Sequence, residues 1–90
     1  SNDAPREYFE FKDITYDVTF GNDLTRHGGP FDRGSADSYY RRFGEPHYWP
    51  EGTGHGEKVT LENMTEAEVD EYNAGVEYNE NVVQDYKDWG

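Results

Sequence analysis

The chain has 90 residues, no cysteine and a formal net charge of −12. A length of this order predicts one domain, and without thiols it has no disulfide or thiolate zinc site to stabilise it. The negative charge repels nucleic acid and anionic lipid and attracts basic protein surfaces, so it disfavours direct nucleic-acid binding. No apolar run approaches the roughly 20 residues that cross a bilayer, and the lack of cysteine favours a cytoplasmic location.

Aromatic rings are expected to form the core. Leu, Ile, Val and Phe supply only 14 of the 90 residues, whereas Phe, Tyr and Trp make up 17% of the chain. Few aliphatic residues and a high net charge are typical of disorder, but disordered chains are poor in aromatic residues, whose large apolar area favours collapse. The composition therefore predicts a single folded domain over 1–90, with residues 1–7 flexible.

Residues 8–20 are predicted to be β-structure. The second half alternates strictly between apolar and polar residues, which is typical of a half-buried strand. The residues on the apolar face are Ile14, Tyr16, Val18 and Phe20. A short strand over 8–11 is expected to precede it, with Lys12 and Asp13 as a tight connection.

A first helix is predicted over 31–43, capped by Asp32 or Ser35 and ended by Gly44. Its apolar positions at helical spacing are Ala36, Tyr39, Tyr40 and Phe43. Gly34 is a poor helix former, so we expect either a close backbone approach there or a later start at Ser35. Residues 44–58 contain two prolines and several glycines and are predicted to be a loop, followed by a short strand over 58–61.

A second helix is predicted over 66–78, with weaker helical structure to 83. Thr65 and Glu68 have the spacing of a capping box. The stripe that faces the core is expected to contain Val69, Tyr72, Val76, Asn79 and Val83. Gly75 lies in its middle and indicates a close approach by another element. The tail over 84–90 carries Tyr86 and Trp89, which are expected to pack back onto the core.

These elements predict an α+β fold, in which an N-terminal strand or hairpin packs against two helices joined by a long Gly/Pro-rich loop. No motif indicates a metal, a cofactor or catalysis. His27, His47 and His55 lie far apart in predicted loops, and the sequence has no GxSxG, P-loop or GxGxxG pattern. We therefore expect no metal, no cofactor and no enzyme activity, and a small enzyme or metalloprotein ranks last among the hypotheses.

Two surfaces are candidates for binding a partner. The first is an aromatic and cationic surface, rich in residue types that dominate interfaces. It comprises Arg33, Asp37, Tyr40, Arg41, Arg42, His47, Tyr48 and Trp49. The alternative is structural, with Tyr39, Tyr40 and Trp49 in the core and Arg33 paired with Asp37 at i, i+4.

The second candidate surface is an acidic face on the second predicted helix. It comprises Glu66, Asp70, Glu71, Glu77 and Glu80. Such a face can imitate the phosphate charges of nucleic acid and occupy a basic groove. The alternative is a solvated face that only keeps a small protein soluble.

Four stretches of the sequence resemble one protein family. They are Asp32-Arg33-Gly34-Ser35-Ala36-Asp37-Ser38-Tyr39-Tyr40-x-Arg42, Pro46-His47-Tyr48-Trp49-Pro50, Thr65-x-x-Glu68-Val69-x-Glu71-Tyr72-x-x-Gly75 and Lys87-Asp88-Trp89. The string is similar to a family of small phage and prophage proteins for which no activity is established. The resemblance covers roughly residues 30–90 and implies a role inside an infected bacterial cell.

A fainter resemblance is to ribosome modulation factor, in which an Arg-Gly pair opens a helix and a second helix carries a glycine. The matching positions are Arg33, Gly34, Arg42, Pro46 and Gly75. That family is basic, as a ribosomal RNA binder must be, whereas this chain is acidic and lacks that family's second-helix tryptophans. The resemblance implies a two-helix arrangement more than a shared function.

Two functions from different classes follow as hypotheses. The first is a small acidic phage-type protein in the cytoplasm of an infected bacterium, which binds and modulates a host or phage protein that has a basic surface. A nucleic-acid mimic that inhibits its partner is the sharper version. The alternative is a ribosome- or RNA-associated factor that uses an arginine cluster, namely Arg26, Arg33, Arg41 and Arg42. The oligomeric state is left open.

Overall fold

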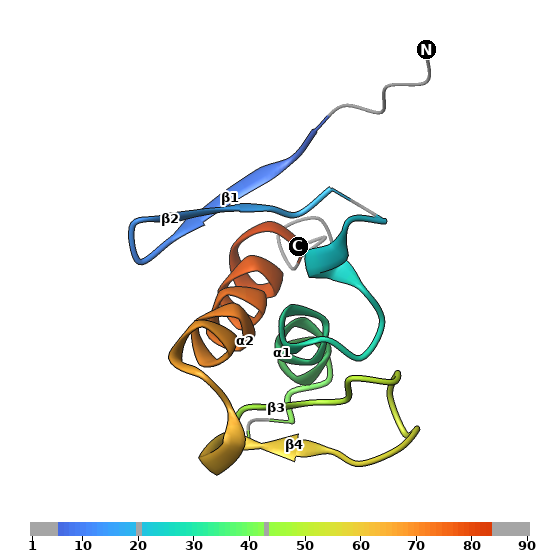
Figure 1. The fold of residues 1–90 in the computed structure, drawn as a ribbon. Helices are drawn as coiled ribbons and strands as arrows, with labels where there is room; N and C mark the ends of the chain where they lie inside the picture. The colour runs from blue at the N-terminus through green and yellow to red at the C-terminus, as the bar shows by residue number, and fades with distance from the viewer. Residues whose placement is uncertain (1–5, 20, 43, 84–90) are drawn as a thin grey trace.

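The computed structural model describes residues 6–19, 21–42 and 44–83 (Figure 1). The helices and strands in chain order are β1 (Tyr8–Phe11), β2 (Ile14–Asp17), η1 (Asp23–Thr25), α1 (Pro30–Tyr39), β3 (His47–Tyr48), β4 (Val59–Thr60), η2 (Leu61–Asn63), α2 (Glu66–Tyr78) and the π-helical turn η3 (Asn79–Val83). Figure 1 shows the two α-helices between the β1–β2 hairpin and the β3–β4 pair. The predicted α+β fold, a hairpin packed on two helices, is confirmed.

The β1–β2 hairpin turns at the two residues that the sequence predicted. Lys12 and Asp13 have φ angles of 53° and 63°, the left-handed pair that a two-residue hairpin turn needs. The strands pair antiparallel, with Phe9 opposite Tyr16. β2 ends at Asp17, because the Thr19 hydroxyl and amide both donate to the Asp17 carboxylate and turn the chain.

The predicted apolar face of β2 is correct only in part. Tyr16 and Val18 are buried, but Ile14, beside the turn, is 41% exposed. Phe20, the last predicted member, lies outside the described residues. The alternation therefore holds where the strand lies over the helices and fails at the hairpin's end.

Helix α1 begins earlier than predicted. Gly29 is the N-cap and Pro30 the first helical residue, so neither Asp32 nor Ser35 caps the helix and a late start at Ser35 is wrong. Proline suits this position because its fixed φ is helical and its missing N–H would have no partner. The Asp32 carboxylate instead accepts from the Gly28 N–H at 2.8 Å, just before the helix.

Helix α1 also ends earlier than predicted, at Tyr39 rather than near Gly44. Arg41 has a φ of 57°, and its N–H donates to the Ser38 carbonyl at 3.1 Å, while the Arg42 N–H donates to the Asp37 carbonyl at 2.6 Å. This pair of bonds around a left-handed residue is the Schellman ending of a helix. An arginine therefore occupies the position that the sequence assigned to a glycine.

The two α-helices cross through their glycines. A Cβ on Gly34 would lie 1.9 Å from the Tyr72 carbonyl oxygen, and one on Gly75 would lie 2.1 Å from the Phe31 carbonyl oxygen. Each helix thus presses its backbone against the other where the partner has no side chain. The close approach expected at both glycines is confirmed.

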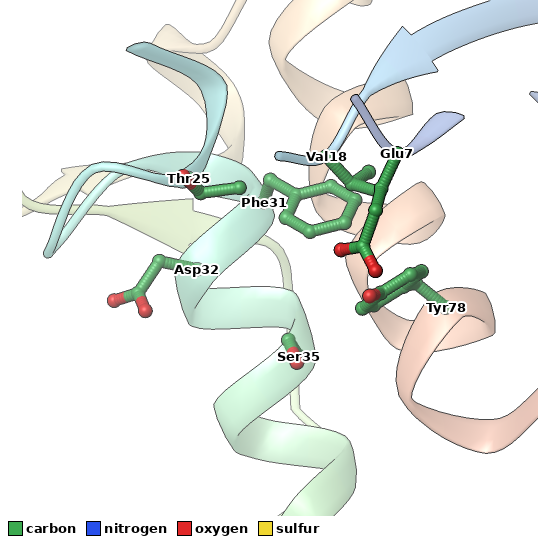
Figure 2. Close-up of a pocket in the computed structure, with 7 residues that line it drawn as sticks. All are labelled: Glu7, Val18, Thr25, Phe31, Asp32, Ser35 and Tyr78. Carbon is green, nitrogen blue, oxygen red and sulfur yellow. The ribbon is translucent and has the colours of Figure 1, made fainter. Parts of the chain in front are cut away.

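Aromatic rings pack around this crossing. The buried residues Tyr16, Val18, Phe31 and Ala74 form the core cluster. Tyr78 contacts Phe31 with ring centroids 5.5 Å apart. Figure 2 shows Phe31 on α1 pointing toward Val18 and Tyr78. Rings therefore supply core area that aliphatic residues supply elsewhere, as the composition predicted.

Two predictions about which side chains are in the core do not hold. Tyr39 and Tyr40 are 42% and 63% exposed, because α1 ends there and leaves both rings outside the crossing. In α2, Tyr72 and Asn79 of the predicted stripe are buried, whereas Val69 and Val76 are only half-buried. The expected packing of Tyr86 and Trp89, and the side chain of Val83, lie outside the described residues.

Helix α2 has the bounds predicted from the sequence, Glu66–Tyr78, and the complete capping box between Thr65 and Glu68. Just before it, β4 pairs antiparallel with β3, with His47 opposite Thr60. β4 falls within the strand predicted over 58–61, whereas β3 falls where only a loop was predicted. None of the described helices is long and apolar enough to cross a bilayer.

Candidate functional site

Asp37 is a buried carboxylate that joins three elements. It lies 3.5 Å from Arg33 Nη2 on the same helix, so the predicted i, i+4 ion pair is present. The Tyr72 hydroxyl of α2 donates to Asp37 Oδ2, and His47 Nδ1 of β3 lies 3.9 Å from the same oxygen. Burial, followed by the hydrogen bond to Asp37, raises the pKa of Tyr72. Tyr72 therefore stays a phenol that donates to Asp37 at neutral pH.

This cluster removes several predicted partner-binding residues from the surface. Asp37 is only 6% exposed. Arg33 forms an ion pair with Asp37, and its Nη1 donates to the Thr53 hydroxyl at 3.3 Å. The half-buried His47 places its Nδ1 3.1 Å from the Glu45 carbonyl oxygen. The predicted aromatic-cationic surface is therefore not one surface, because Asp37 and His47 link α1 to α2 and β3 and Arg33 is paired within the molecule.

Tyr48 and Trp49 are also held by the fold. Both are half-buried. The Tyr48 hydroxyl donates to Glu68 Oε2 at 2.8 Å, and this bond together with burial raises the pKa of Tyr48. The backbone N–H of Trp49 donates to the Gly28 carbonyl at 2.7 Å. These contacts attach the β3 segment to the start of α2 and to the loop before α1.

The rest of the predicted surface is exposed at the C-terminal end of α1. Tyr40, Arg41 and Arg42 are all exposed. The Arg42 guanidinium carbon lies 5.3 Å from the centre of the Tyr40 ring, within cation–π range. The Tyr39 and Tyr40 rings meet edge to face at 4.8 Å. Exposed tyrosine and arginine are residue types enriched in interface hot spots.

A groove of about 230 Å³ lies beside these rings. We call it the Tyr39–Tyr40 groove; it is lined by Asp32, Ser35, Ala36, Tyr39, Tyr40 and Asn79. Asn79 is fully buried; its Nδ2 donates to the Ser38 hydroxyl at 3.0 Å, which in turn donates to Glu80 Oε2 at 3.2 Å. Asn79 Oδ1 accepts no hydrogen bond from any described residue.

No sequence pattern predicted this groove. Asn79 was predicted only as part of the core-facing stripe of the second helix. A polar residue at an apolar position of a helical stripe was the one available signal, because a buried amide needs partners for its oxygen and its nitrogen. That the oxygen lacks its partner is a property of the packing, which no sequence pattern contains.

The predicted acidic face divides into two parts. With about 100° per residue, Glu66, Asp70 and Glu77 lie within about 40° of one another around α2. We call these three residues the acidic ridge. Asp70 is paired with Lys12 at 3.0 Å, and no other acidic-ridge carboxylate has a cationic partner among the described residues.

Glu71 and Glu80, the other two predicted members, do not point with the ridge. Glu71 lies about 100° further around the helix than Asp70. It is half-buried, and burial raises its pKa. Glu80 is exposed but accepts from Ser38 of α1, because the π-helical turn η3 rotates it toward that helix.

A further pocket, of about 390 Å³, lies between the hairpin and α1 (Figure 2). Its lining residues are Glu7, Val18, Thr25, Phe31, Asp32, Ser35 and Tyr78. Three hydroxyl groups line it, those of Thr25, Ser35 and Tyr78, and none of its lining residues is a histidine or lysine. Among the described residues no group of three or more His, Asp or Glu side chains is arranged to hold a metal ion.

No protein-family model, curated protein or solved structure matches the chain. Function is therefore inferred from the geometry and charge described above.

Proposed function

We propose that this chain is a small acidic interaction protein of the phage type, which binds a basic surface on a host protein and modulates that protein. The observation that carries the proposal is the acidic ridge. Glu66, Asp70 and Glu77 lie on the side of α2 that turns away from α1. Glu66 is exposed, Asp70 and Glu77 are half-buried, and only Asp70 is neutralised by a cation among the described residues.

The acidic ridge is held rigidly. Helix α2 is fixed at its start by the capping box and the Tyr48–Glu68 hydrogen bond, and in its middle by the contact of Gly75 with α1. With a rise of 1.5 Å per residue, the two ends of the ridge are about 16 Å apart. Rigid charges bind at a lower entropic cost, because little ordering is needed when the partner arrives.

The net charge supports a nucleic-acid mimic as the sharper form of this proposal. The molecule carries a net charge of −12 on a body of 38 × 35 × 27 Å. A duplex likewise presents dense negative charge, about one charge per 1.7 Å of helix axis. A basic groove that accepts a phosphate backbone would therefore attract this chain as well.

The arginine arrangement favours this proposal over RNA binding. An RNA-binding cluster needs free guanidinium groups to neutralise phosphates. Arg33, a central member of the suggested cluster, is instead committed to Asp37 and Thr53 inside the molecule. Of that cluster, Arg26, Arg41 and Arg42 are exposed, and they stand against a net charge of −12 on the chain.

The test compares two variants with the same change in net charge. The ridge variant is E66Q/D70N/E77Q; the control variant E10Q/E57Q/E62Q neutralises exposed acids elsewhere. Affinity capture from bacterial lysate with the wild-type chain identifies the partner, and calorimetry with that purified partner measures each dissociation constant. The lost charge pairs of Glu66 and Glu77, at roughly 0.5–1 kcal/mol each, predict weakening of about 5-fold or more for the ridge variant.

The control variant should weaken binding by less than about 3-fold, and duplex DNA should displace the chain if it acts as a mimic. Equal weakening by the two variants would show that overall charge, not the acidic ridge, makes the contact. Capture of no protein above background would leave the proposal without a partner and overturn it.

A further inference from the structure

We propose that the Tyr39–Tyr40 groove is the pocket in which the basic partner places an arginine side chain. The inference rests on the proposed function only in taking the partner to be basic. It adds a second contact, on α1, to the acidic ridge of α2, and it names the residue that this contact recognises.

The side-chain oxygen of Asn79 has no partner among the residues that the structure describes. Asn79 is fully buried and lines the groove, and its Oδ1 accepts no hydrogen bond from them. Leaving a buried acceptor without a hydrogen bond is destabilising, because the group has lost its water and gained no donor. The amide cannot correct this by turning over, because its Nδ2 already donates to Ser38, whose hydroxyl donates to Glu80. Among the described residues no donor meets this oxygen, and we assign that place to a donor from the partner.

The groove has an exposed aromatic wall, formed by Tyr39 and Tyr40. Tyr40 is 63% exposed, and its ring already attracts a guanidinium, that of Arg42, at 5.3 Å. The contact within the chain shows the chemistry that the ring accepts. A partner's arginine would stack on the tyrosine wall, either on the free face of Tyr40 or in place of Arg42.

The lining of the groove also carries negative charge. The carboxylate of Asp32 lines the groove, and the one cation described next to its walls is Arg42, over the Tyr40 ring. Glu80 is not a lining residue, but its carboxylate is joined to Asn79 through the Ser38 hydroxyl. The field within the groove therefore favours a cation over a neutral donor such as an amide.

Arginine fits these features better than lysine. Its planar guanidinium can stack on a tyrosine while its edge donates to a carboxylate and to Asn79 Oδ1 at once. A lysine ammonium is a strongly hydrated point charge that cannot stack in this way. The groove volume of about 230 Å³ admits one side chain rather than a helix or strand.

The test uses Nα-acetyl-arginine amide, titrated into the isotope-labelled chain and followed by amide NMR shifts. Saturable shifts are expected at Tyr40, at its neighbours and at the Asn79 side-chain amide, with a dissociation constant in the millimolar range. Two analogues serve as controls. Nα-acetyl-lysine amide has the same charge, and Nα-acetyl-citrulline amide has nearly the same shape without the charge.

Tyr40→Ala should weaken arginine amide binding at least 5-fold, and Tyr40→Phe should keep it within 2-fold. Both variants change an exposed side chain, so both should fold as the wild type does. Equal shifts with the lysine amide would reduce the effect to general charge attraction and overturn the inference. So would shifts away from the groove, or full binding by Tyr40→Ala.

The same reagents separate this inference from the proposed function. The ridge variant E66Q/D70N/E77Q should bind arginine amide within 2-fold of wild type, because the acidic ridge lies outside the groove. Ridge-dependent capture of a partner, with no effect of Tyr40→Ala on it, would overturn the groove and keep the function. Arginine amide binding without a captured partner would keep the groove and overturn the function.

Discussion

Replacing Gly34 by alanine tests the helix crossing, because the local and tertiary arguments predict opposite signs. Helix propensity alone predicts that alanine in an α-helix is about 1 kcal/mol more stable than glycine. At Gly34, however, the added Cβ would lie 1.9 Å from the Tyr72 carbonyl oxygen and 2.8 Å from its carbonyl carbon. Both are backbone atoms in the middle of α2, so they cannot turn aside as a side chain would.

The magnitude follows from the movement required. To reach a Cβ–oxygen distance of even 3.0 Å, the two helices must separate by roughly 1 Å at the crossing, which opens the packing around Phe31 and Ala74. Overpacking of a core costs about 1–3 kcal/mol, and the loosened contacts add to it. A domain of this size has only about 4–13 kcal/mol of stability in total. We expect Gly34→Ala to lose about 3 kcal/mol, and Gly75→Ala to behave similarly.

Urea unfolding followed by far-ultraviolet circular dichroism measures the free energy of unfolding of each variant. Gly44→Ala is the matched control, since a Cβ there meets nothing within 4 Å and Gly44 has no positive φ. The control should stay within about 0.5 kcal/mol of wild type. A Gly34→Ala protein as stable as wild type would show that the helices do not touch through their backbones, and the reasoning would be refuted.

Three further substitutions test the polar contacts and the turn. Tyr72→Phe leaves the buried Asp37 without its donor and should cost about 1–3 kcal/mol in urea unfolding. Because the raised pKa of Tyr72 makes wild-type stability fall above about pH 10, this variant should also lose stability less steeply there; an equal slope would contradict this. Arg41→Gly should raise the free energy of unfolding by up to about 1 kcal/mol. A left-handed non-glycine residue costs about 1–2 kcal/mol, and glycine's extra chain entropy offsets only part of that. A loss of stability would contradict the assigned turn. Burial raises the pKa of Glu71, so its stability contribution is present below its ordinary pKa near 4.5 and is lost as the pH rises through the folded value. Glu71→Gln should therefore be more stable than wild type at pH 7 but not at pH 3, as urea midpoints at the two pH values would show.

The elements that the sequence predicted best are those whose signals are local. The capping box of Thr65 and Glu68 and the Lys12–Asp13 turn each depend on residues within a few positions of one another. Helix α2 therefore has its predicted bounds, and the hairpin turns at its predicted place. Even the glycines of the crossing were informative, because a glycine inside a helix is costly unless another backbone uses the space.

The missed features depend on contacts between distant segments. β3 exists because His47 and Tyr48 pair with β4, which lies after a long Gly-rich loop. The left-handed residue that ends α1 is Arg41, two positions after the last helical residue. It had no local signal in the sequence, because an arginine was not expected to adopt a left-handed conformation. The predicted acidic face split for a similar reason: the turn of the helix and the π-helical turn η3 direct Glu71 and Glu80 toward other elements.

The glycine crossing also explains how a chain so poor in aliphatic residues keeps two helices together, and why its polar groups lie where they do. Helices in backbone contact leave no room for leucine or isoleucine between them, so at Gly34 and Gly75 the low aliphatic content is no deficit. The same proximity brings side chains flanking the crossing within hydrogen-bond reach, which couples Asp37 to Tyr72 and Ser38 to Asn79. One consequence is a buried amide whose oxygen has no donor in the part of the chain that the structure describes. The contact that specifies the fold thus also creates the groove on α1, while the acidic ridge lies on the opposite side of α2.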